Sequence, residues 1–371
     1  MDSFSHCKLR EKYVHMKAMI INEICNIKVP GQTLRDDTKI AKLEPLQLVD
    51  MPVPEPGPED ILIKVLACGI CRTELDQIEG RIMPPKLPVI PGHQPVGIIA
   101  GSGSRARKFK IGERAGAAWI FSACGKCKFC REGAENLCDQ FQGTGCHANG
   151  GYAEYMVISE DFAYKIPEGL TDSVKTAPLM CSGIVGYRSL KLTGMEDGRT
   201  LGLYGFGSAH HLVIQMANYL FPNSQKFVIS RNPVERALAK SLGADWVGDI
   251  DDKTPEKLDC IIDTTPAWKP VVSALENLEK GGRLVINLIR KEAGDKEFLL
   301  KLDYAQHLWL EKEIKTVANV TRADAEEFLA LAARMKIQPE IQEFKLEDAN
   351  KALIELKSGN IRGSKVLVMP N

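Results

Sequence analysis

The chain has 371 residues, with 48 Lys and Arg against 48 Asp and Glu, so its formal net charge is zero. This balance excludes the strongly basic class of nucleic-acid-binding proteins and provides no field that attracts an anionic membrane surface. We therefore expect neither nucleic acid nor a membrane as a partner. The length predicts two or three compact units with enough material for a substantial core.

The sequence also indicates where the protein works. No stretch approaches the roughly 20 apolar residues of a membrane span, and charged side chains interrupt the N-terminus where a signal peptide is apolar. We expect a cytoplasmic location. In that reducing compartment the 11 cysteines are not expected to form disulfides, so clustered cysteines are interpreted first as metal ligands. The residues before Met16 are assigned no role.

The first part of the chain, from Met19 to about Pro167, contains short β-branched runs separated by Pro- and Gly-rich turns. Strand-like runs lie at 17–21, 61–65 and 96–100. This pattern predicts an irregular β domain.

From about Cys181 the pattern changes to alternating strands and helices. Strands are predicted at 201–204, 227–230, 258–263 and 284–288, with helices at 209–219, 233–242 and 271–280. Such alternation predicts a parallel, doubly wound sheet.

The last part of the chain, after about Asn319, begins with a helix for which Thr321 provides the N-cap. A strand at 341–344, a helix at 347–357 and a closing strand at 365–368 follow. We expect this tail to return to the first domain. The predicted domains are therefore 16–182 together with 320–371, and 183–319.

The most specific motif is a loop of four cysteines with the spacing C-x2-C-x2-C-x7-C. One loop with this spacing can place four thiolates around a tetrahedral ion, and Gly125 and Gly133 supply its tight bends. Zinc suits four soft thiolates, whereas an iron–sulfur cluster or unpaired thiols are the alternatives. Four protein ligands leave no open position, so this zinc is expected to be structural. The ligands are Cys124, Cys127, Cys130 and Cys138.

A second, scattered set consists of Cys71, His93 and Cys181, which follow strand-like runs or open a helix. Each is weak evidence alone, because a lone His is more often structural and a lone Cys is more often a small buried hydrophobe. Together with the cysteine loop they become specific.

At this point the chain resembles the zinc-containing alcohol dehydrogenases of the medium-chain dehydrogenase/reductase superfamily, from about Met19 to the C-terminus. The resemblance implies a GroES-like irregular β-barrel catalytic domain and a Rossmann doubly wound domain. It also implies a catalytic zinc held by Cys71, His93 and Cys181, with the fourth position left for water or substrate oxygen. It is carried by the motifs Cys71-Arg-Thr-Glu, Gly92-His93, the cysteine loop, Gly150-Gly-Tyr-Ala-Glu-Tyr, Cys181 and the glycine loop at 205–207.

The same resemblance assigns roles around this metal. Thr73 occupies the place of the hydroxyl that takes the substrate proton. Glu74 stands where an aspartate usually hydrogen-bonds the ligating histidine. Asp76 replaces a histidine that many members use to pass the proton outward, and Gln94 replaces a glutamate beneath the zinc. Loss of that glutamate either slows turnover without removing the metal or reflects simple drift.

A dinucleotide site is predicted where a glycine loop joins the 201–204 strand to the next helix, because it lets a pyrophosphate approach the helix N-terminus. His210 replaces the third glycine, which either costs helix–strand closeness or adds a phosphate donor. The predicted cofactor-binding residues of the loop are Gly205, Phe206, Gly207 and Ser208.

The next strand ends at Ser230 and Arg231, with no acidic residue there. A hydroxyl and an arginine suit a 2′-phosphate, so NADP(H) is favoured over NAD(H), unless Arg231 is only a solvated cap. The resemblance adds two pyrophosphate contacts, Arg72 and Lys365, with Arg362 competing for the latter place.

The resemblance places Trp119 in the wall of a substrate channel, although Trp119 as ordinary core is an equal alternative. Ile78 takes the place of a tryptophan found in some small-alcohol enzymes, which predicts a deeper pocket. The remaining expected lining is Ile120, Phe141 and Leu288.

The sequence therefore predicts an enzyme with two zinc ions per chain that moves a hydride between NAD(P)(H) and a small alcohol or aldehyde, as a homodimer or homotetramer. Two alternatives stay open. One is a non-catalytic dinucleotide-binding protein, redox-responsive or structural, on the same scaffold. The other is a quinone or enone reductase, a group that typically lacks both zinc sets.

Overall fold

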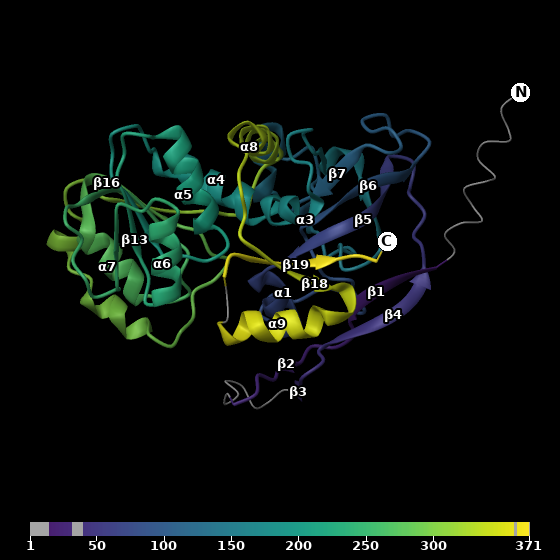
Figure 1. The fold of residues 1–371 in the computed structure, drawn as a ribbon, viewed down its shortest axis with the longest axis horizontal. Helices are drawn as coiled ribbons and strands as arrows, with labels where there is room; N and C mark the ends of the chain where they lie inside the picture. The colour runs from purple at the N-terminus through teal and green to yellow at the C-terminus, as the bar shows by residue number, and fades with distance from the viewer. Residues whose placement is uncertain (1–14, 32–39, 360–361, 371) are drawn as a thin grey trace, which may run out of the picture. The chain divides into compact units, whose positions relative to one another are not determined.

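The computed structural model describes residues 15–31, 40–359 and 362–370, and the chain divides into two compact units (Figure 1). The first unit combines Met1–Cys181 with Ile341–Asn371, and the second is Ser182–Glu340. Within the described residues, no helix is long and apolar enough to cross a membrane.

The first unit is built on a seven-stranded sheet in the order β11-β7-β6-β5-β19-β18, with β10 paired to β5. Its central strand β5 alternates buried and half-buried side chains, as expected for a strand with one face on the core. The predicted irregular β domain is confirmed. The strands are β5 (Asp60–Ile70), β6 (Pro95–Ser102), β7 (Arg114–Ala117), β10 (Tyr155–Ser159), β11 (Ala163–Lys165), β18 (Ile341–Lys345) and β19 (Ser364–Val368).

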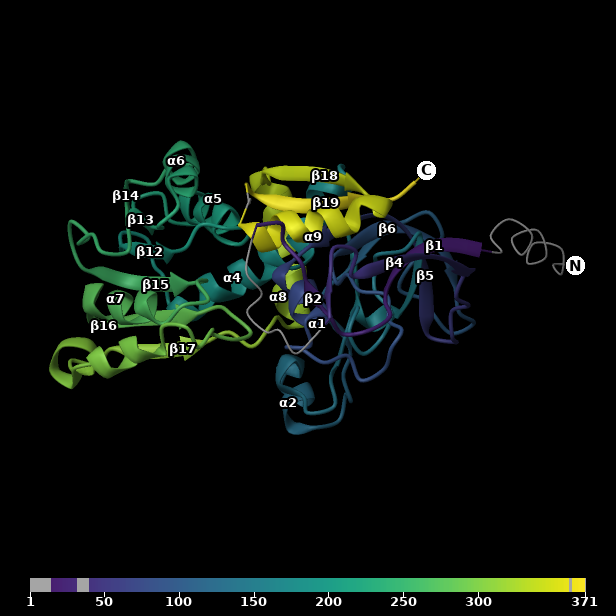
Figure 2. The ribbon, with the colours of Figure 1, turned by 90° about the horizontal axis from the view of Figure 1, so that it is seen from below.

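The tail strands β18 and β19 complete this sheet, as predicted, and helix α9 (Ala349–Ser358) lies along them (Figure 2). Smaller pairs of strands flank the sheet. They are β1 (His15–Ile21) with β4 (Leu46–Pro52), β2 (Asn26–Ile27) with β3 (Ala41–Lys42), and β8 (Ile120–Ser122) with β9 (Gln142–Gly143).

Short helices in the first unit were not predicted, because they lack an amphipathic pattern of useful length. α1 (Arg72–Ile78) is buried along most of its length. The others are α2 (Lys128–Arg131), α3 (Ser173–Thr176) and the 3-10 turns Glu135–Leu137, Glu160–Phe162, Ala177–Met180 and Leu346–Asp348.

The second unit contains a six-stranded parallel sheet in the order β14-β13-β12-β15-β16-β17. The order reverses direction between β12 and β15, and such a switch point is where doubly wound sheets bind their ligands. The predicted Rossmann domain is confirmed. Its strands are β12 (Leu201–Tyr204), β13 (Lys226–Ile229), β14 (Trp246–Gly248), β15 (Leu258–Asp263), β16 (Leu278–Ile286) and β17 (Glu313–Thr316), and its helices are α4 (Ser182–Thr193), α5 (His210–Leu220), α6 (Pro233–Ser241), α7 (Lys269–Asn277) and α8 (Arg322–Met335).

Two boundaries differ from the predictions. The helix expected to run to residue 280 ends at Asn277, because Leu278 already pairs with Leu258 in the sheet. The second unit continues to Glu340 instead of ending at residue 319, because α8 packs on α4. Arg188 of α4 donates to Asp324 of α8 at 2.5 Å, which ties the two helices together.

The predicted N-cap of α8 is confirmed. The Thr321 hydroxyl accepts from the Asp324 N–H at 3.1 Å, and the Asp324 carboxylate accepts from the Thr321 N–H at 3.0 Å. This reciprocal capping box satisfies two backbone donors that a helix otherwise leaves without partners.

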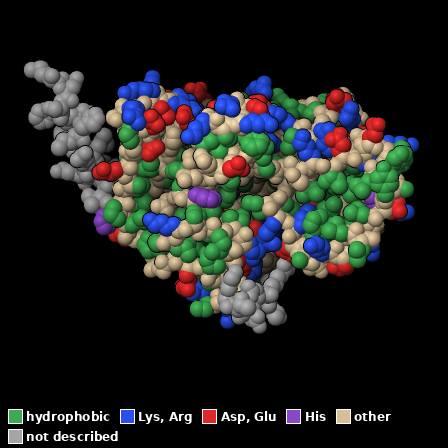
Figure 3. Space-filling model, turned by 180° about the vertical axis from the view of Figure 1, so that it is seen from behind, with side chains coloured by type: hydrophobic (Ala, Val, Ile, Leu, Met, Phe, Trp, Pro, Cys, Tyr) green, Lys and Arg blue, Asp and Glu red, His purple; other side chains and the backbone are tan. Residues whose placement is uncertain are grey.

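The surface agrees with the charge balance. Basic and acidic side chains are interspersed over the face shown in Figure 3.

Candidate active site

The structure brings together the three scattered ligand candidates of the first unit. Cys71 follows β5 and is the N-cap of α1, His93 precedes β6, and Cys181 follows the turn Ala177–Met180. One sulfur or ring-nitrogen atom from each lies within 4.8 Å of those of the other two. That spacing fits three ligands around one metal ion.

Glu74 fixes the orientation of His93. Its carboxylate is fully buried and lies 2.6 Å from the His93 Nδ1 atom, and it also accepts from the Cys71 N–H at 2.8 Å. Because a carboxylate only accepts, the Nδ1 atom carries the proton and Nε2 is left with its lone pair for a metal. The longer glutamate thus reaches the position that the family usually gives to aspartate.

The electrostatics of this cluster favour a cation. Hydrogen bonding from Cys181, reinforced by His93, holds the pKa of the Cys71 thiol well below its usual range. Burial opposes protonation of His93, yet the Glu74 carboxylate and the Cys71 thiolate raise its pKa to about 10, so Nε2 holds a proton that a bound metal ion would displace. Two sulfurs, one imidazole and a buried carboxylate make a donor set with excess negative charge, and such a set fits zinc.

Thr73 lies beside these ligands, with its hydroxyl 3.6 Å from the Cys71 sulfur. Arg72 is exposed. The turn from β5 into α1 therefore presents Cys71 and Thr73 to the same place while Arg72 faces solvent.

Asp76 and Gln94, which replace a histidine and a glutamate of the family pattern, are both buried. Asp76 is engaged with Arg81, whose Nε donates to it at 2.5 Å. The Gln94 side chain packs against the backbone of Gly69, where any side chain would come within 2.5 Å of the Gln94 Oε1 atom. The contacts with Arg81 and Gly69 were not predicted from the sequence, because they depend on how the chain packs around α1.

The four-cysteine loop closes on itself, as its spacing indicates. One sulfur from each cysteine lies within 4.8 Å of the others. The Cys124 sulfur accepts from the Cys127 N–H at 3.3 Å, and the Cys127 sulfur accepts from the Cys130 N–H at 3.5 Å. Backbone donors, with the Lys126 N–H first, lower the pKa of Cys124 to about 6. Gly125 and Gly133 have φ of 71° and 70°, in the left-handed region that favours glycine.

The glycine loop of the second unit follows β12. Gly205 has φ of 79°, and a side chain at Gly207 would meet no atom within 4 Å. Open space above Gly207 fits the close approach of a pyrophosphate. The Ser208 hydroxyl lies 2.7 Å from that of Ser182, and the Phe206 side chain is buried.

His210, which stands at the position of the third glycine of the motif, has its side chain inside the second unit. It is fully buried, its Nδ1 atom donates to the Gly205 carbonyl at 2.6 Å, and burial lowers its pKa to about 4. The ring is therefore neutral and braces the loop from below. Because its Nδ1 proton is engaged with Gly205 and its ring is fully buried, the structure does not support His210 as a phosphate donor.

The end of β13 holds an acidic group that was missed. Ser230 is buried and its hydroxyl donates to the Glu235 carboxylate at 2.5 Å, while Arg231 is exposed. The same Glu235 oxygen accepts from the Phe206 N–H at 3.2 Å. The strand end itself holds no acidic residue, as expected, but Glu235 from the first turn of α6 reaches it.

The structure contradicts the expectation that Lys365 contacts the pyrophosphate. Its side chain is 1% exposed, and its ammonium donates to Gln342 at 2.9 Å and to Glu355 at 2.8 Å. An ammonium committed in this way inside the first unit is not available to a pyrophosphate. Arg362, the competing assignment, is exposed.

Trp119 lies against the metal cluster. Its ring meets that of His93 edge-on, with centroids 5.3 Å apart, and it is 5% exposed. Ile78 and Ile120 are buried in the core of the first unit, whereas Phe141 and Leu288 are half-buried in their respective units. Of the expected lining residues, Trp119 is thus the one whose ring contacts that of a ligand candidate within the described part of the chain.

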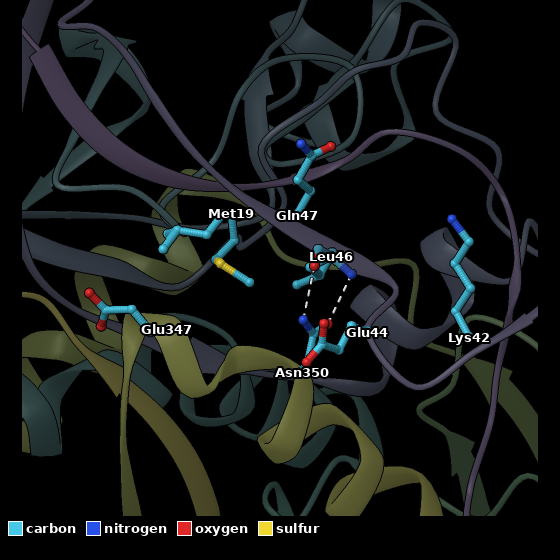
Figure 4. Close-up of a pocket in the computed structure, with 8 residues that line it drawn as sticks. Met19, Lys42, Glu44, Leu46, Gln47, Glu347 and Asn350 are labelled. Atoms are coloured by element: carbon cyan, nitrogen blue, oxygen red, sulfur yellow. Dashed lines mark hydrogen bonds between the residues drawn. The ribbon is translucent and has the colours of Figure 1, made fainter.

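A separate hollow of the first unit contains no predicted site residue. It is bordered by β1, β4 and α9, and two of its lining residues are joined there, because the Asn350 amide exchanges two 2.9 Å hydrogen bonds with the Leu46 backbone (Figure 4). Asn350 thus anchors α9 to β4. The hollow is lined by Met19, Lys42, Glu44, Leu46, Gln47, Leu48, Glu347 and Asn350.

Comparison with known proteins agrees with this geometry. Residues 57–168 match the profile of the alcohol dehydrogenase GroES-like domain. A probable alcohol dehydrogenase of Mycobacterium tuberculosis is 41% identical over 330 residues, covering 88% of this chain and 93% of its own. An alcohol dehydrogenase of Geobacillus stearothermophilus is 32% identical, covering 95% of this chain and 98% of its own.

The fold also matches solved structures. The structure of a cinnamyl alcohol dehydrogenase from Sorghum bicolor matches with a TM-score of 0.80 at 25% identity, covering 95% of this chain and 97% of that one.

Proposed function

Because the chain belongs to the zinc-containing alcohol dehydrogenases of the medium-chain dehydrogenase/reductase superfamily, we propose that it moves a hydride between a nicotinamide dinucleotide and a small alcohol or aldehyde. The observation that carries the proposal is the convergence of Cys71, His93 and Cys181, with the Thr73 hydroxyl beside them. The similarity to the two alcohol dehydrogenases named above extends over 93% and 98% of their own lengths.

The catalytic zinc is assigned to these three ligands. A zinc ion with three protein ligands keeps one position open and supplies Lewis-acid polarisation of a substrate oxygen. Cys71 and Cys181 contribute thiolates, His93 contributes Nε2, and Glu74 holds the imidazole in place. The Thr73 hydroxyl receives the proton of the alcohol in oxidation and returns it in reduction.

A second, structural zinc is assigned to the cysteine loop, which gives two zinc ions per chain. Four sulfurs at mutual ligand distance, with backbone N–H groups donating to them, support this assignment. The closed donor set leaves no position for a substrate.

For the cofactor we propose NADP(H), with NAD(H) also accepted. The open space above Gly207 and the turn at Gly205 support binding of the pyrophosphate. The exposed Arg231 supports recognition of a 2′-phosphate, and Arg72, also exposed, is the proposed pyrophosphate contact. The nicotinamide ring supplies the hydride chemistry.

The assembly is proposed to be a homodimer or homotetramer in the cytoplasm. Support for an oligomer comes from β17, an edge strand of the second-unit sheet whose four residues are all exposed. An uncovered edge strand pairs readily with another strand, and exposed apolar groups nearby indicate a surface that is covered in solution. These groups are Tyr304, Trp309, Leu310 and Ile314. Light scattering on the purified protein tests this, and a monomer contradicts it.

The alternative functions are separated by one experiment. Purified protein is assayed for zinc content and for NADP(H)- and NAD(H)-linked turnover of a panel of primary alcohols and aromatic aldehydes. Two zinc ions with turnover support the proposal. Two zinc ions with no turnover on any member favour the non-catalytic dinucleotide-binding protein, for which the buried Asp76 and Gln94 are the supporting features. Absence of zinc favours a quinone or enone reductase.

A further inference from the structure

A single carboxylate of the second unit bridges the turn after β12 and the end of β13. The Glu235 Oε2 atom accepts from the Phe206 N–H at 3.2 Å and from the Ser230 hydroxyl at 2.5 Å. Phe206 belongs to the turn after β12, and Ser230 follows β13, the neighbouring parallel strand. The carboxylate therefore lies at the carboxyl ends of two adjacent strands.

The chemistry of a dinucleotide makes this position decisive. In a doubly wound sheet the pyrophosphate lies at the glycine loop, and the 2′ position of the adenosine ribose lies near the end of the second strand. A carboxylate at that place accepts a hydrogen bond from a 2′-hydroxyl and repels a 2′-phosphate.

The hydrogen-bond pattern adds a second effect in the same direction. A serine hydroxyl has one proton, and in Ser230 it is donated to Glu235. The Ser230 hydroxyl oxygen in turn accepts from the Asn232 N–H at 3.2 Å. While Glu235 is ionised and in place, Ser230 has no proton to offer a phosphate.

Two arginines lie near Ser230, and they differ in whether their charge is already balanced by another carboxylate. Arg236 donates to the Ser230 carbonyl at 2.5 Å and pairs with Asp249 at 3.1 Å, so its charge is balanced locally. Arg231 is exposed and extends from the same strand end. Arg231 attracts a 2′-phosphate, and Glu235 opposes it.

We propose that Glu235 limits the affinity of this chain for 2′-phosphorylated dinucleotides and thereby keeps NAD(H) usable beside NADP(H). The proposal rests on the dinucleotide site proposed above. Glu235 would then determine specificity from within helix α6, outside the strand-end position where the acidic residue of NAD-binding sites is expected.

The test uses two nucleotides that differ only in the 2′-phosphate, adenosine 2′,5′-bisphosphate and 5′-AMP. Their dissociation constants are measured by calorimetry on the zinc-loaded full chain and on Glu235→Gln. The glutamine is isosteric, its oxygen still accepts from the Phe206 N–H, and its amide N–H frees the Ser230 proton. We expect the affinity ratio of bisphosphate to monophosphate to rise about tenfold or more, as removal of a like charge predicts.

The control is Glu276→Gln, which removes the same charge from an exposed position on α7 of the same unit. A ratio that stays at the wild-type value in Glu235→Gln, or that rises equally in Glu276→Gln, overturns the role of Glu235. If Glu235→Gln does not fold, Glu235→Asp serves as a second variant, because it keeps the negative charge but moves it away from Ser230 on a shorter side chain. An unchanged affinity ratio in Glu235→Asp also counts against the proposal. If the wild-type chain binds neither nucleotide, the dinucleotide site itself is wrong, and this proposal fails with it.

Discussion

The strongest prediction concerns Glu74, the buried carboxylate behind the catalytic ligands. It serves two donors at once, the Cys71 N–H at 2.8 Å and the His93 Nδ1 at 2.6 Å. A carboxylate has an acceptor oxygen for each, whereas an amide has one oxygen and one N–H group. Glu74→Gln therefore either breaks the bond to the Cys71 N–H or forces His93 into the tautomer that blocks Nε2.

The size of the effect follows from that mismatch. Losing a hydrogen bond to a charged group in a buried place costs about 1.5–3 kcal/mol, which corresponds to a loss of zinc affinity of about 10- to 150-fold. Loss of a group that orients a metal-ligating histidine typically weakens metal binding or activity by about 10- to 100-fold, which is the same range.

The assay is the release of zinc to a competing chromogenic chelator, followed by absorbance. Wild-type protein is expected to release two zinc ions in separable steps, and only one step should become easier in Glu74→Gln. The cysteine loop is the internal control, because Glu74 has no contact with its sulfurs among the hydrogen bonds and ion pairs of the described residues. Identical release curves for the two proteins would refute the reasoning.

Four further predictions address other parts of the site and the fold. Thr73→Val should lower kcat by about 100-fold or more with two zinc ions still bound; unchanged kcat contradicts the proton role. Gln94→Glu should raise kcat in the NAD(P)(H)-linked turnover assay. Equal turnover of the two proteins would indicate that Gln94 replaced glutamate by neutral drift. Cys130→Ser should remove one zinc and make the cysteine loop protease-sensitive, as judged by metal content and limited digestion. Burial lowers the pKa of His211 from 6.5 to about 4. As the pH falls, His211 is therefore protonated first in the unfolded chain, so its contribution to the free energy of unfolding is full above about pH 6.5 and is lost towards pH 4. At about pH 5 this loss amounts to about 2 kcal/mol. His211→Gln should remove that part of the loss in urea unfolding compared at about pH 8 and pH 5.

Much of the fold was predictable because its patterns are local. The strand at 201–204 was predicted at the observed bounds of β12, because a short apolar run ends directly at Gly205. Thr321 predicted the start of α8 as its N-cap, and the structure adds the reciprocal bond from Asp324. By contrast, β14 and β17 were not predicted, since each is three or four residues long and lacks a clear alternation.

The site was predictable where spacing or motif identifies chemistry, and not where tertiary packing decides. The cysteine spacing and the Cys71, His93 and Cys181 motifs anticipated both clusters. The partners of Lys365 and the reach of Glu235 were beyond the sequence, because each depends on which element packs beside the side chain. The pairing of α8 with α4 moved a domain boundary for the same reason.

The most direct test of the central claim is a crystal structure of the zinc-loaded protein with anomalous scattering measured at the zinc absorption edge. We predict one peak among the four sulfurs of the cysteine loop. A second peak should lie among Cys71, His93 and Cys181, with a solvent or substrate oxygen as its fourth ligand. No peak at the second place, or a zinc there closed by a fourth protein ligand, would contradict the proposal that this chain uses an open zinc site to act on alcohols.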